Sequence, residues 1–226
     1  MGKPGFQLES SLRKRGIWPV AGVDEAGRGP LAGPVAAAAV ILGPGRLPRG
    51  LDDSKALTPE ERERLSGEIL SHALAVSAAF ASVAEIDRFN IRQAALLAMR
   101  RALAALSIAP RHVLIDGKDI PPGLPISAEA IVQGDSTVAS IAAASIIAKV
   151  TRDRLMRRAC GHYPAYGFSA HFGYPTKAHR EAIARHGPCP LHRMSFKPFK
   201  KGPEGLPRDP GTEAHEERPA TPGPAR

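Results

Sequence analysis

The stretch Gly22-Val-Asp-Glu-Ala-Gly-Arg-Gly-Pro-Leu-Ala-Gly33 decides how the rest of this chain is interpreted. An apolar run leads into two adjacent carboxylates, Asp24 and Glu25, and a glycine-rich turn follows at once. A run of this kind predicts a buried strand that ends in a tight turn. Catalytic side chains tend to lie on loops held by a rigid scaffold, and carboxylate oxygens bind Mg²⁺ or Mn²⁺. Two acids alone are more typical of a solvated turn, so the residues downstream must decide.

Apolar runs flank the glycine turn on both sides. Residues 18–24 predict a first strand and residues 34–42 a second, joined as an antiparallel hairpin. The glycines at 27, 29 and 33 also resemble a dinucleotide-binding loop, but such a loop should open an amphipathic helix. Here the next run is almost wholly apolar and stops at Gly43-Pro-Gly45, so a Rossmann fold is disfavoured.

Capping signals divide the middle of the chain into helices. Thr58 with Glu61, and Ser82 with Glu85, have the spacing of a capping box, and Asn90 is a further N-cap. Residues 1–16 show no clear periodicity and are expected to be a loose lead-in. We expect strands at 75–81, 112–115 and 130–132, and helices at 91–106, 137–160 and 177–186. The mixture of strands and helices indicates an α/β fold.

Acids follow the later strands as well. Asp116 comes directly after the strand at 112–115, and Asp135 follows the strand at 130–132. If these strands share a sheet with the first one, the two acids can converge with Asp24 and Glu25. Carboxylates crowded together repel one another, so such a cluster generally implies bound divalent cations. Because strand alternation points neighbouring side chains to opposite faces, Glu25 needs a turn beginning at Ala26 to reach the metals.

Asp153 competes with Asp135 for the place of the fourth acid. It lies 18 positions further on, which is about 27 Å along a helix axis. Both residues cannot serve one site if the helix is unbroken. We choose Asp135, which follows a strand, and expect Asp153 to pair with Arg157 four residues on.

The charge of the chain indicates a polyanionic partner. Its 31 Lys and Arg against 22 Asp and Glu give a net charge of +9. Residues 151–200 hold ten of these cations and two acids, so nucleic acid is favoured over a membrane surface. Cys160 and Cys189 are expected to be reduced thiols, and no apolar run reaches the ~18 residues of a membrane helix. We therefore expect a cytoplasmic protein.

Several motifs in order along the chain resemble the ribonuclease HII family, the type 2 ribonucleases H. They cover residues 18–200 and are Asp24-Glu-Ala-Gly-Arg-Gly29, Asp53-Ser-Lys55, Asp116-Gly117, Gly134-Asp-Ser136, Ala143-Ala-Ser-Ile-Ile-Ala-Lys-Val-Thr-Arg-Asp153 and His192-Arg-Met-Ser-Phe196. The resemblance implies an RNase H-like mixed sheet flanked by helices, with a helical C-terminal portion. It also implies cutting of the RNA strand of RNA–DNA hybrids, and cutting 5′ of single ribonucleotides embedded in duplex DNA. The ends would be a 5′-phosphate and a 3′-hydroxyl, in the removal of misincorporated ribonucleotides and RNA primers.

Carried over residue by residue, the resemblance assigns roles to two groups of positions. Two Mn²⁺ or Mg²⁺ ions would be bound during catalysis by four acids, Asp24, Glu25, Asp116 and Asp135. The 2′-hydroxyl would be sensed by Gly27, Arg28 and Gly29, and the sugar at the junction would pack on Tyr174. One departure is Phe172, where the family usually has a lysine. Tyr166 and Phe168 are expected in the core rather than at the substrate.

The resulting organisation is a lead-in at residues 1–17, a catalytic domain at 18–200 and a tail at 201–226. Within the domain, residues 151–200 form a basic helical portion, and the tail is rich in Pro and Gly and expected to be disordered. We expect a monomer that binds RNA–DNA hybrids and ribonucleotide-containing duplex DNA, with no motif for a protein partner. The alternative is a protein that binds hybrids or duplexes without catalysis, its acids being structural.

Overall fold

A five-stranded mixed sheet forms the centre of the computed structural model, which describes residues 3–45 and 47–200. The strands run in the order β3-β2-β1-β4-β5, with β1 in the middle. β1 is antiparallel to β2, and β2 to β3, whereas β1, β4 and β5 are parallel to one another. This arrangement confirms the predicted hairpin and the mixed α/β sheet. The strand bounds are β1 Val20–Ala26, β2 Val35–Ile41, β3 Ala75–Ala81, β4 His112–Asp116 and β5 Ser127–Ile131.

The parallel pairing sends the carboxyl ends of β1, β4 and β5 to the same edge of the sheet. Asp24 and Asp116 lie near the ends of β1 and β4, and Asp135 lies in the short 3-10 helix η1 (Gly134–Ser136) that follows β5. Every residue of β2 is buried, as expected of a continuous apolar run in a strand with both faces covered.

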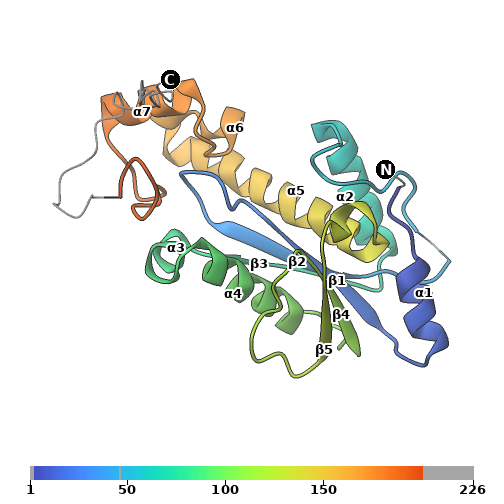
Figure 1. Cartoon of the computed structure of the whole chain (residues 1–226). Helices are drawn as coiled ribbons and strands as arrows, with labels where there is room; N and C mark the ends of the chain where they lie inside the picture. The colour runs from blue at the N-terminus through green and yellow to red at the C-terminus, as the bar shows by residue number, and fades with distance from the viewer. Residues whose placement is uncertain (1–2, 46, 201–226) are drawn as a thin grey trace, which may run out of the picture.

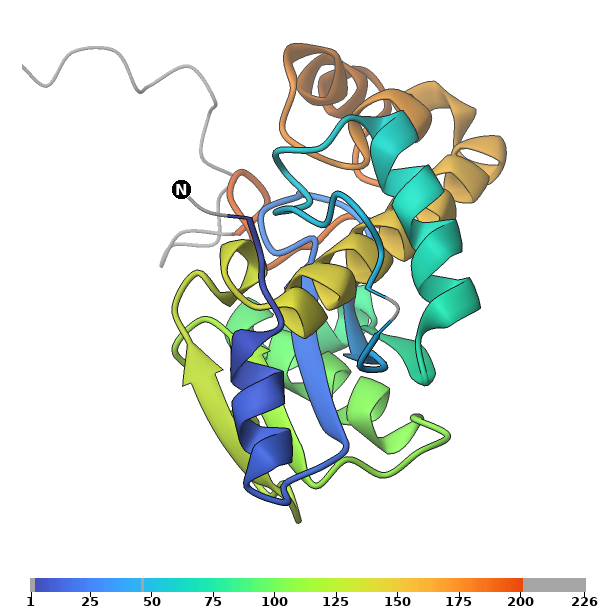
Figure 2. The ribbon, with the colours of Figure 1, turned by 90° about the vertical axis from the view of Figure 1, so that its right-hand side faces the viewer.

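The long helix α5 (Ala139–His162) crosses one face of the sheet (Figure 1). Its first turn lies against Gly22 so closely that a Cβ there would stand 2.2 Å from the carbonyl carbon of Ser140. Glycine is therefore required at this position of β1. α2 (Pro59–His72) packs beside α5 on the same side, as Figure 2 shows from another direction.

The opposite face of the sheet is covered by α4 (Ile91–Ala104), preceded by the short α3 (Val83–Phe89). Both predicted capping boxes are present, with the side chain of Glu61 bonding back to Thr58 and that of Glu85 to Ser82. Asn90 caps α4 as predicted. These helix starts were predictable because each cap involves residues only three apart.

The expectation of a loose N-terminal lead-in is wrong, because residues 7–14 form the helix α1 (Gln7–Lys14). Leu12 of this helix is buried against Val20 and Leu114 of the sheet. Glu9 is fully buried, and its Oε1 accepts a hydrogen bond of 2.9 Å from the backbone N–H of Ser140. α1 thus supplies a carboxylate to the start of α5, which has no side-chain cap of its own.

The C-terminal portion continues from the end of α5 as a small helical unit, as expected (Figure 1). It contains η2 (Pro164–Tyr166), α6 (Phe168–His171) and α7 (Lys177–His186), and α7 has the bounds that the sequence predicts. Among the helices of the described ranges, none has the length and apolar character needed to cross a membrane. The predicted tail at 201–226 lies outside the described residues.

Histidines connect the segments of this helical unit. The backbone N–H of Cys189 donates to Nδ1 of His192 (2.8 Å), which leaves Nε2 of His192 to donate to Nε2 of His179 (3.1 Å). Nδ1 of His179 then donates to the carbonyl oxygen of Tyr174 (2.9 Å). The two rings are therefore held neutral, each with a defined tautomer.

Candidate active site

Three of the four predicted acids come together at one edge of the sheet. One carboxylate oxygen from each of Asp24, Asp116 and Asp135 lies within 4.8 Å of the others. We call these three residues the acid cluster. Each comes from a different parallel strand or the turn beyond it, so the convergence follows from the strand pairing. In addition, the backbone N–H of Asp135 donates to Oδ1 of Asp116 (3.2 Å), which fixes the two residues relative to each other.

Glu25 lies beside the acid cluster rather than within it. β1 continues through Ala26, which pairs with Ala36, so the turn that would swing Glu25 inwards does not begin there. Instead Oε1 of Glu25 accepts a hydrogen bond of 3.1 Å from Nη1 of Arg28. Burial raises the pKa of Glu25, the nearby Arg28 guanidinium opposes that rise, and the charge of Asp116 adds to it.

The electrostatics of the acid cluster favour a bound cation. Burial, followed by the charges of Glu25 and Asp116, raises the pKa of Asp24 well above its usual range. Burial and the charge of Asp135 likewise raise the pKa of Asp116. The repulsion between such buried carboxylates is relieved either by protonation or by a positive charge held between them. Three oxygen donors at this spacing fit a hard divalent cation.

Lys55 is a residue of the site that the sequence analysis did not single out. Its Nζ lies 3.1 Å from Oδ2 of Asp135 and 3.5 Å from Oδ1 of Asp53. Burial alone would lower the pKa of Lys55, but the hydrogen bond and charge of Asp135, with the charges of Asp53 and Asp24, raise it. Lys55 could have been identified from the sequence, because Asp53-Ser-Lys55 is one of the motifs on which the resemblance rests.

Two buried serines connect the Lys55 loop to the acid cluster. Oγ of Ser54 lies 2.8 Å from Oγ of Ser145 on α5. The Ser145 hydroxyl in turn lowers the pKa of the Asp24 carboxyl, against the larger effect of burial, which raises it. Arg62 of α2 holds the same loop by donating to the carbonyl oxygen of Ser54 (2.7 Å). Ser145 was detectable as a hydroxyl within the otherwise apolar run of α5.

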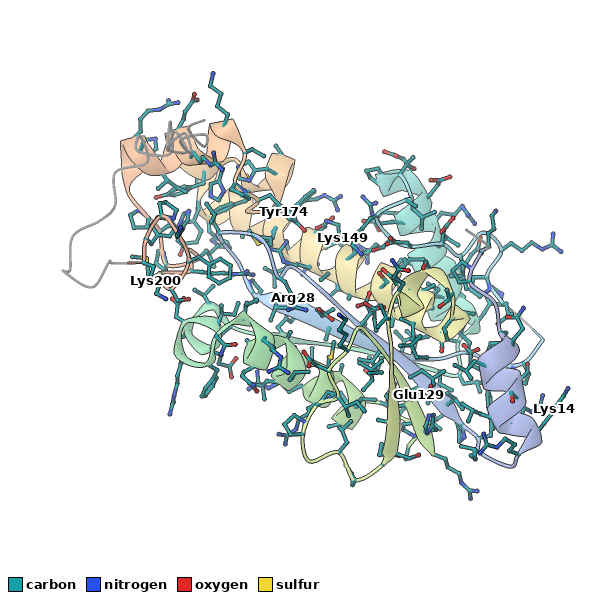
Figure 3. All side chains as sticks on the ribbon, in the orientation of Figure 1. Lys14, Arg28, Glu129, Lys149, Tyr174 and Lys200 are labelled. Atoms are coloured by element: carbon teal, nitrogen blue, oxygen red, sulfur yellow. The ribbon has the colours of Figure 1, made fainter. Side chains whose placement is uncertain are left out.

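The predicted substrate-sensing residues lie next to the acids, where Arg28, Gly29 and Tyr174 form an exposed patch and Gly27 is buried beneath it. Gly27 adopts a φ of +96°, and a Cβ at Gly29 would lie 3.8 Å from Cε1 of Tyr174. Tyr174 is 40% exposed, and Figure 3 shows it with Arg28 and Lys149 in the same region of the molecule. Within the described part of the chain, the backbone N–H groups of Arg28 and Gly29 donate to no protein acceptor.

The Phe172 ring contacts two cationic side chains, at the position where the resemblance implies a lysine. Nζ of Lys149 lies 5.1 Å from the centre of the Phe172 ring, and the guanidinium carbon of Arg157 lies 5.5 Å from it. The positive charge at this place therefore comes from α5. Tyr166 and Phe168 stack on each other in the core, as expected, with ring centres 5.5 Å apart.

The predicted pairing of Asp153 is wrong. Its Oδ1 accepts from Nζ of Lys149 at 2.8 Å, one turn earlier on α5, while Arg157 pairs with Glu63 of α2. α2 packs against α5 at this point, and that tertiary contact determines the partner of Arg157. Asp153 is not part of the acid cluster.

The sequence is similar to those of known proteins over most of its length. A family model described as Ribonuclease HII matches residues 21–199. A ribonuclease HII of Sinorhizobium fredii (strain NBRC 101917 / NGR234) is 61% identical over 201 residues, which cover 89% of this chain and 87% of the relative.

Solved structures with the same fold are also similar in sequence. The ribonuclease H2 of Pyrococcus horikoshii OT3 has a TM-score of 0.67 at 29% identity, covering 79% of this chain and 93% of that one. The RNase HII of Archaeoglobus fulgidus, solved in complex with PCNA, has a TM-score of 0.68 at 27% identity, covering 84% and 100%.

Proposed function

The chain belongs to the ribonuclease HII family and cleaves the RNA strand of RNA–DNA hybrids, and we propose that it also cuts 5′ of single ribonucleotides in duplex DNA. The ends it leaves are a 5′-phosphate and a 3′-hydroxyl. Its task is the removal of misincorporated ribonucleotides and RNA primers during replication and repair. Family membership makes a purely binding role, with structural acids, the weaker alternative.

The observation that carries the proposal is the acid cluster. Its three carboxylates are close together, largely buried and matched within hydrogen-bond distance by one ammonium group, that of Lys55. Asp24, Asp116 and Asp135 would hold Mn²⁺ or Mg²⁺, with Glu25 at the border of the site. Two such ions, held by these residues, would supply an activated water and stabilisation of the leaving oxygen of a phosphodiester.

The residues around the acid cluster have positioning roles in this proposal. Ser145 acts on Asp24 through its hydroxyl, which favours the charged form of that carboxylate. Lys55 orients Asp135 and adds positive charge where the scissile phosphate must approach. Arg62 of α2 and Ser145 of α5 keep the Lys55 loop in place, because both bond to Ser54. The chemistry thus depends on elements on both sides of β1.

The exposed patch beside the acids would distinguish RNA from DNA. The free N–H groups at Arg28 and Gly29 suit a 2′-hydroxyl oxygen, which is the group that DNA lacks. The ring of Tyr174 suits the apolar face of the neighbouring deoxyribose. Cations of α5 such as Lys149 and Arg157 would bind phosphates, which contribute affinity without information about the sugar.

One catalytic domain carries all of these parts. It corresponds to the predicted unit 18–200, extended at its start to include α1, whose Glu9 contacts α5. The basic helical portion at 151–200 contributes Tyr174 and its supports. We propose that the protein acts as a cytoplasmic monomer.

Labelled duplexes test the proposal directly. Three substrates carry no ribonucleotide, one ribonucleotide or a full RNA strand, each incubated with Mg²⁺, Mn²⁺ or chelator. We expect cutting of the second and third substrates with either metal, at the 5′ side of the single ribonucleotide, and none in chelator. Cutting of the hybrid alone would contradict the proposal for embedded ribonucleotides. Cutting in chelator would contradict the role of the acid cluster as a metal site.

A further inference from the structure

Among the described residues, two arginine side chains are buried completely, and neither of them forms an ion pair there. Arg152 of α5 and Arg193 are both 0% exposed. Their guanidinium groups are satisfied by backbone carbonyl oxygens instead. A buried cation left without partners would be costly, so each of these hydrogen bonds restrains the backbone that provides it.

The carbonyls that Arg152 binds belong to two different segments. Nε donates to Pro34 (3.0 Å) and Nη2 to Ala32 (3.0 Å), both in the loop formed by residues 27–34. Nη1 donates to Phe172 (3.1 Å), in the segment formed by residues 171–174. The planar guanidinium, with its donors pointing in fixed directions, joins the two segments through one rigid group.

The 27–34 loop and the 171–174 segment are also in direct contact. The N–H of Leu31 donates to the carbonyl oxygen of Gly173 (2.8 Å). Gly173 has a φ of +85°, and a Cβ there would stand 2.4 Å from the carbonyl oxygen of Ala32. At the exposed end of this contact, the Tyr174 ring lies against Gly29. The geometry of Tyr174 relative to Gly29 is therefore set by a packed backbone contact with Arg152 behind it.

We propose that Arg152 is a positioning residue for substrate selection, which holds the Tyr174 ring at a fixed place relative to the Gly27–Gly29 backbone. This inference rests on the proposed function, because it assumes that the two elements contact adjacent sugars. A junction between a ribonucleotide and a deoxyribonucleotide is recognised only if both sugars are engaged at once. In an Arg152 variant, the Tyr174 ring and the Gly27–Gly29 backbone would both remain, but their positions relative to each other would no longer be fixed.

Arg193 provides a matched control. It is as deeply buried as Arg152, and it also donates to three carbonyls, those of Gly27, Arg28 and Gly33. All three belong to the 27–34 loop. Loss of Arg193 should therefore weaken the loop itself without releasing the 171–174 segment from Arg152.

A double-mutant cycle separates positioning from general stabilisation. Tyr174→Ala is measured in the unmodified protein, in Arg152→Lys and in Arg193→Lys, as kcat/KM on a duplex with one ribonucleotide, well below each Tm. We expect Tyr174→Ala to slow cutting by about tenfold in the unmodified protein and in Arg193→Lys, by analogy with the stacking of a base on an aromatic ring. In Arg152→Lys the same change should cost less than about threefold, because the ring is already misplaced.

Equal losses in all three proteins, or no loss in the unmodified one, would overturn the proposal. Gly173→Ala gives a second route, since it pushes the two segments apart while Arg152 remains, and it should reduce the Tyr174→Ala effect in the same way. If neither Arg152→Lys nor Gly173→Ala folds, Arg152 is a fold-determining residue and the positioning role is wrong. Failure of the unmodified protein to cut this duplex would instead refute the proposed function.

Discussion

Buried charges of like sign occur in two places, the acid cluster and the pair Arg152 and Arg193. The two places differ in how completely hydrogen bonds match the charge. Each arginine donates to three carbonyl oxygens, so its charge is satisfied by the backbone. The acids are matched less completely among the described residues: Asp24 and Asp116 each accept one backbone N–H, and Lys55 alone provides an ammonium group within hydrogen-bond reach. Burial of charge therefore does not by itself indicate a binding site. What indicates one is buried charge that the protein leaves unmatched.

The largest effect is expected from removing charge in the acid cluster. Asp24→Asn and Asp116→Asn should each reduce cleavage roughly a thousandfold or more, because loss of a ligand removes several kcal/mol of metal-based stabilisation of the transition state. Thermal stability should hold or rise, since the carboxylates repel one another without metal. Single-turnover rates on a hybrid, with melting curves in chelator, measure both quantities.

Asp153→Asn is the control for this prediction. Asp153 is a buried acid too, but its charge is matched by Lys149. Most of the activity should remain in this variant. An inactive Asp153→Asn beside an active Asp135→Asn would show that the wrong acid was assigned to the metal.

Removing a matched charge should instead cost stability. Arg193→Met leaves three carbonyls of the 27–34 loop without their donor, and we expect the free energy of unfolding to fall by about 3–5 kcal/mol. Arg154→Met, on the exposed side of α5, should change it by at most about 0.5 kcal/mol. Urea unfolding in chelator measures the two variants. A small loss for Arg193→Met would mean that water or repacking satisfies the loop.

Lowering the pH should have opposite effects on stability through the hydrogen-bonded pair His179 and His192 and through the acid cluster. Burial lowers the pKa of His192 from 6.5 to about 4, so below pH 6.5 the unfolded chain takes up a proton that the folded protein refuses. Stability from His192 is thus complete above pH 6.5 and is lost as the pH falls towards 4. The raised pKa values of Asp24 and Asp116 act oppositely, because there the folded state binds protons more readily.

The difference between the unmodified protein and His192→Gln isolates the histidine contribution. Between pH 7 and pH 5 the unmodified protein should lose about 2 kcal/mol more than the variant. Urea unfolding at the two pH values measures this difference. Parallel pH dependences would mean that His192 titrates normally in the folded state.

The smallest effect concerns the serine that links α5 to the acid cluster. Ser145→Ala removes a hydroxyl that lowers the pKa of Asp24, so the pKa of that carboxyl should rise further and cutting at neutral pH should fall about tenfold. The pH–rate profile should move to higher pH. Ser54→Ala is the control, because the Ser145 hydroxyl that acts on Asp24 remains in that variant. Equal losses in both variants would place the effect in the Lys55 loop instead.

Local signals in the sequence were sufficient for much of the fold. Thr58 with Glu61 and Ser82 with Glu85 were correctly identified as helix starts, because a capping box depends on neighbours in the chain. The parallel strand ends likewise explain why three predicted acids lie together. The placement of Glu25 depended on the last residue of β1. Glu25 would reach the metals only if a turn began at Ala26, but β1 continues through Ala26.

Contacts between distant segments were beyond the reach of sequence patterns. Arg152 was counted with the other cations of residues 151–200 as support for a nucleic-acid partner, yet it is buried among carbonyls that precede it by 118 and 120 positions. α1 was missed for a similar reason, since a short helix gains its stability from the surface on which it packs. Asp153 and Arg157 have the spacing of a pair, but α2 offers Arg157 another acid.

The hydrogen bond between Glu9 and Ser140 has a consequence for how the chain is made. The two residues are 131 positions apart, so a ribosome releases α1 long before the helix on which it docks exists. Until then the carboxylate of Glu9 stays hydrated, and Leu12 has no apolar surface to cover it. Non-local contacts of this kind form late in folding. The first helix to be synthesised is therefore expected among the last to become protected, and proteolysis of nascent chains stalled before and after α5 would reveal that order.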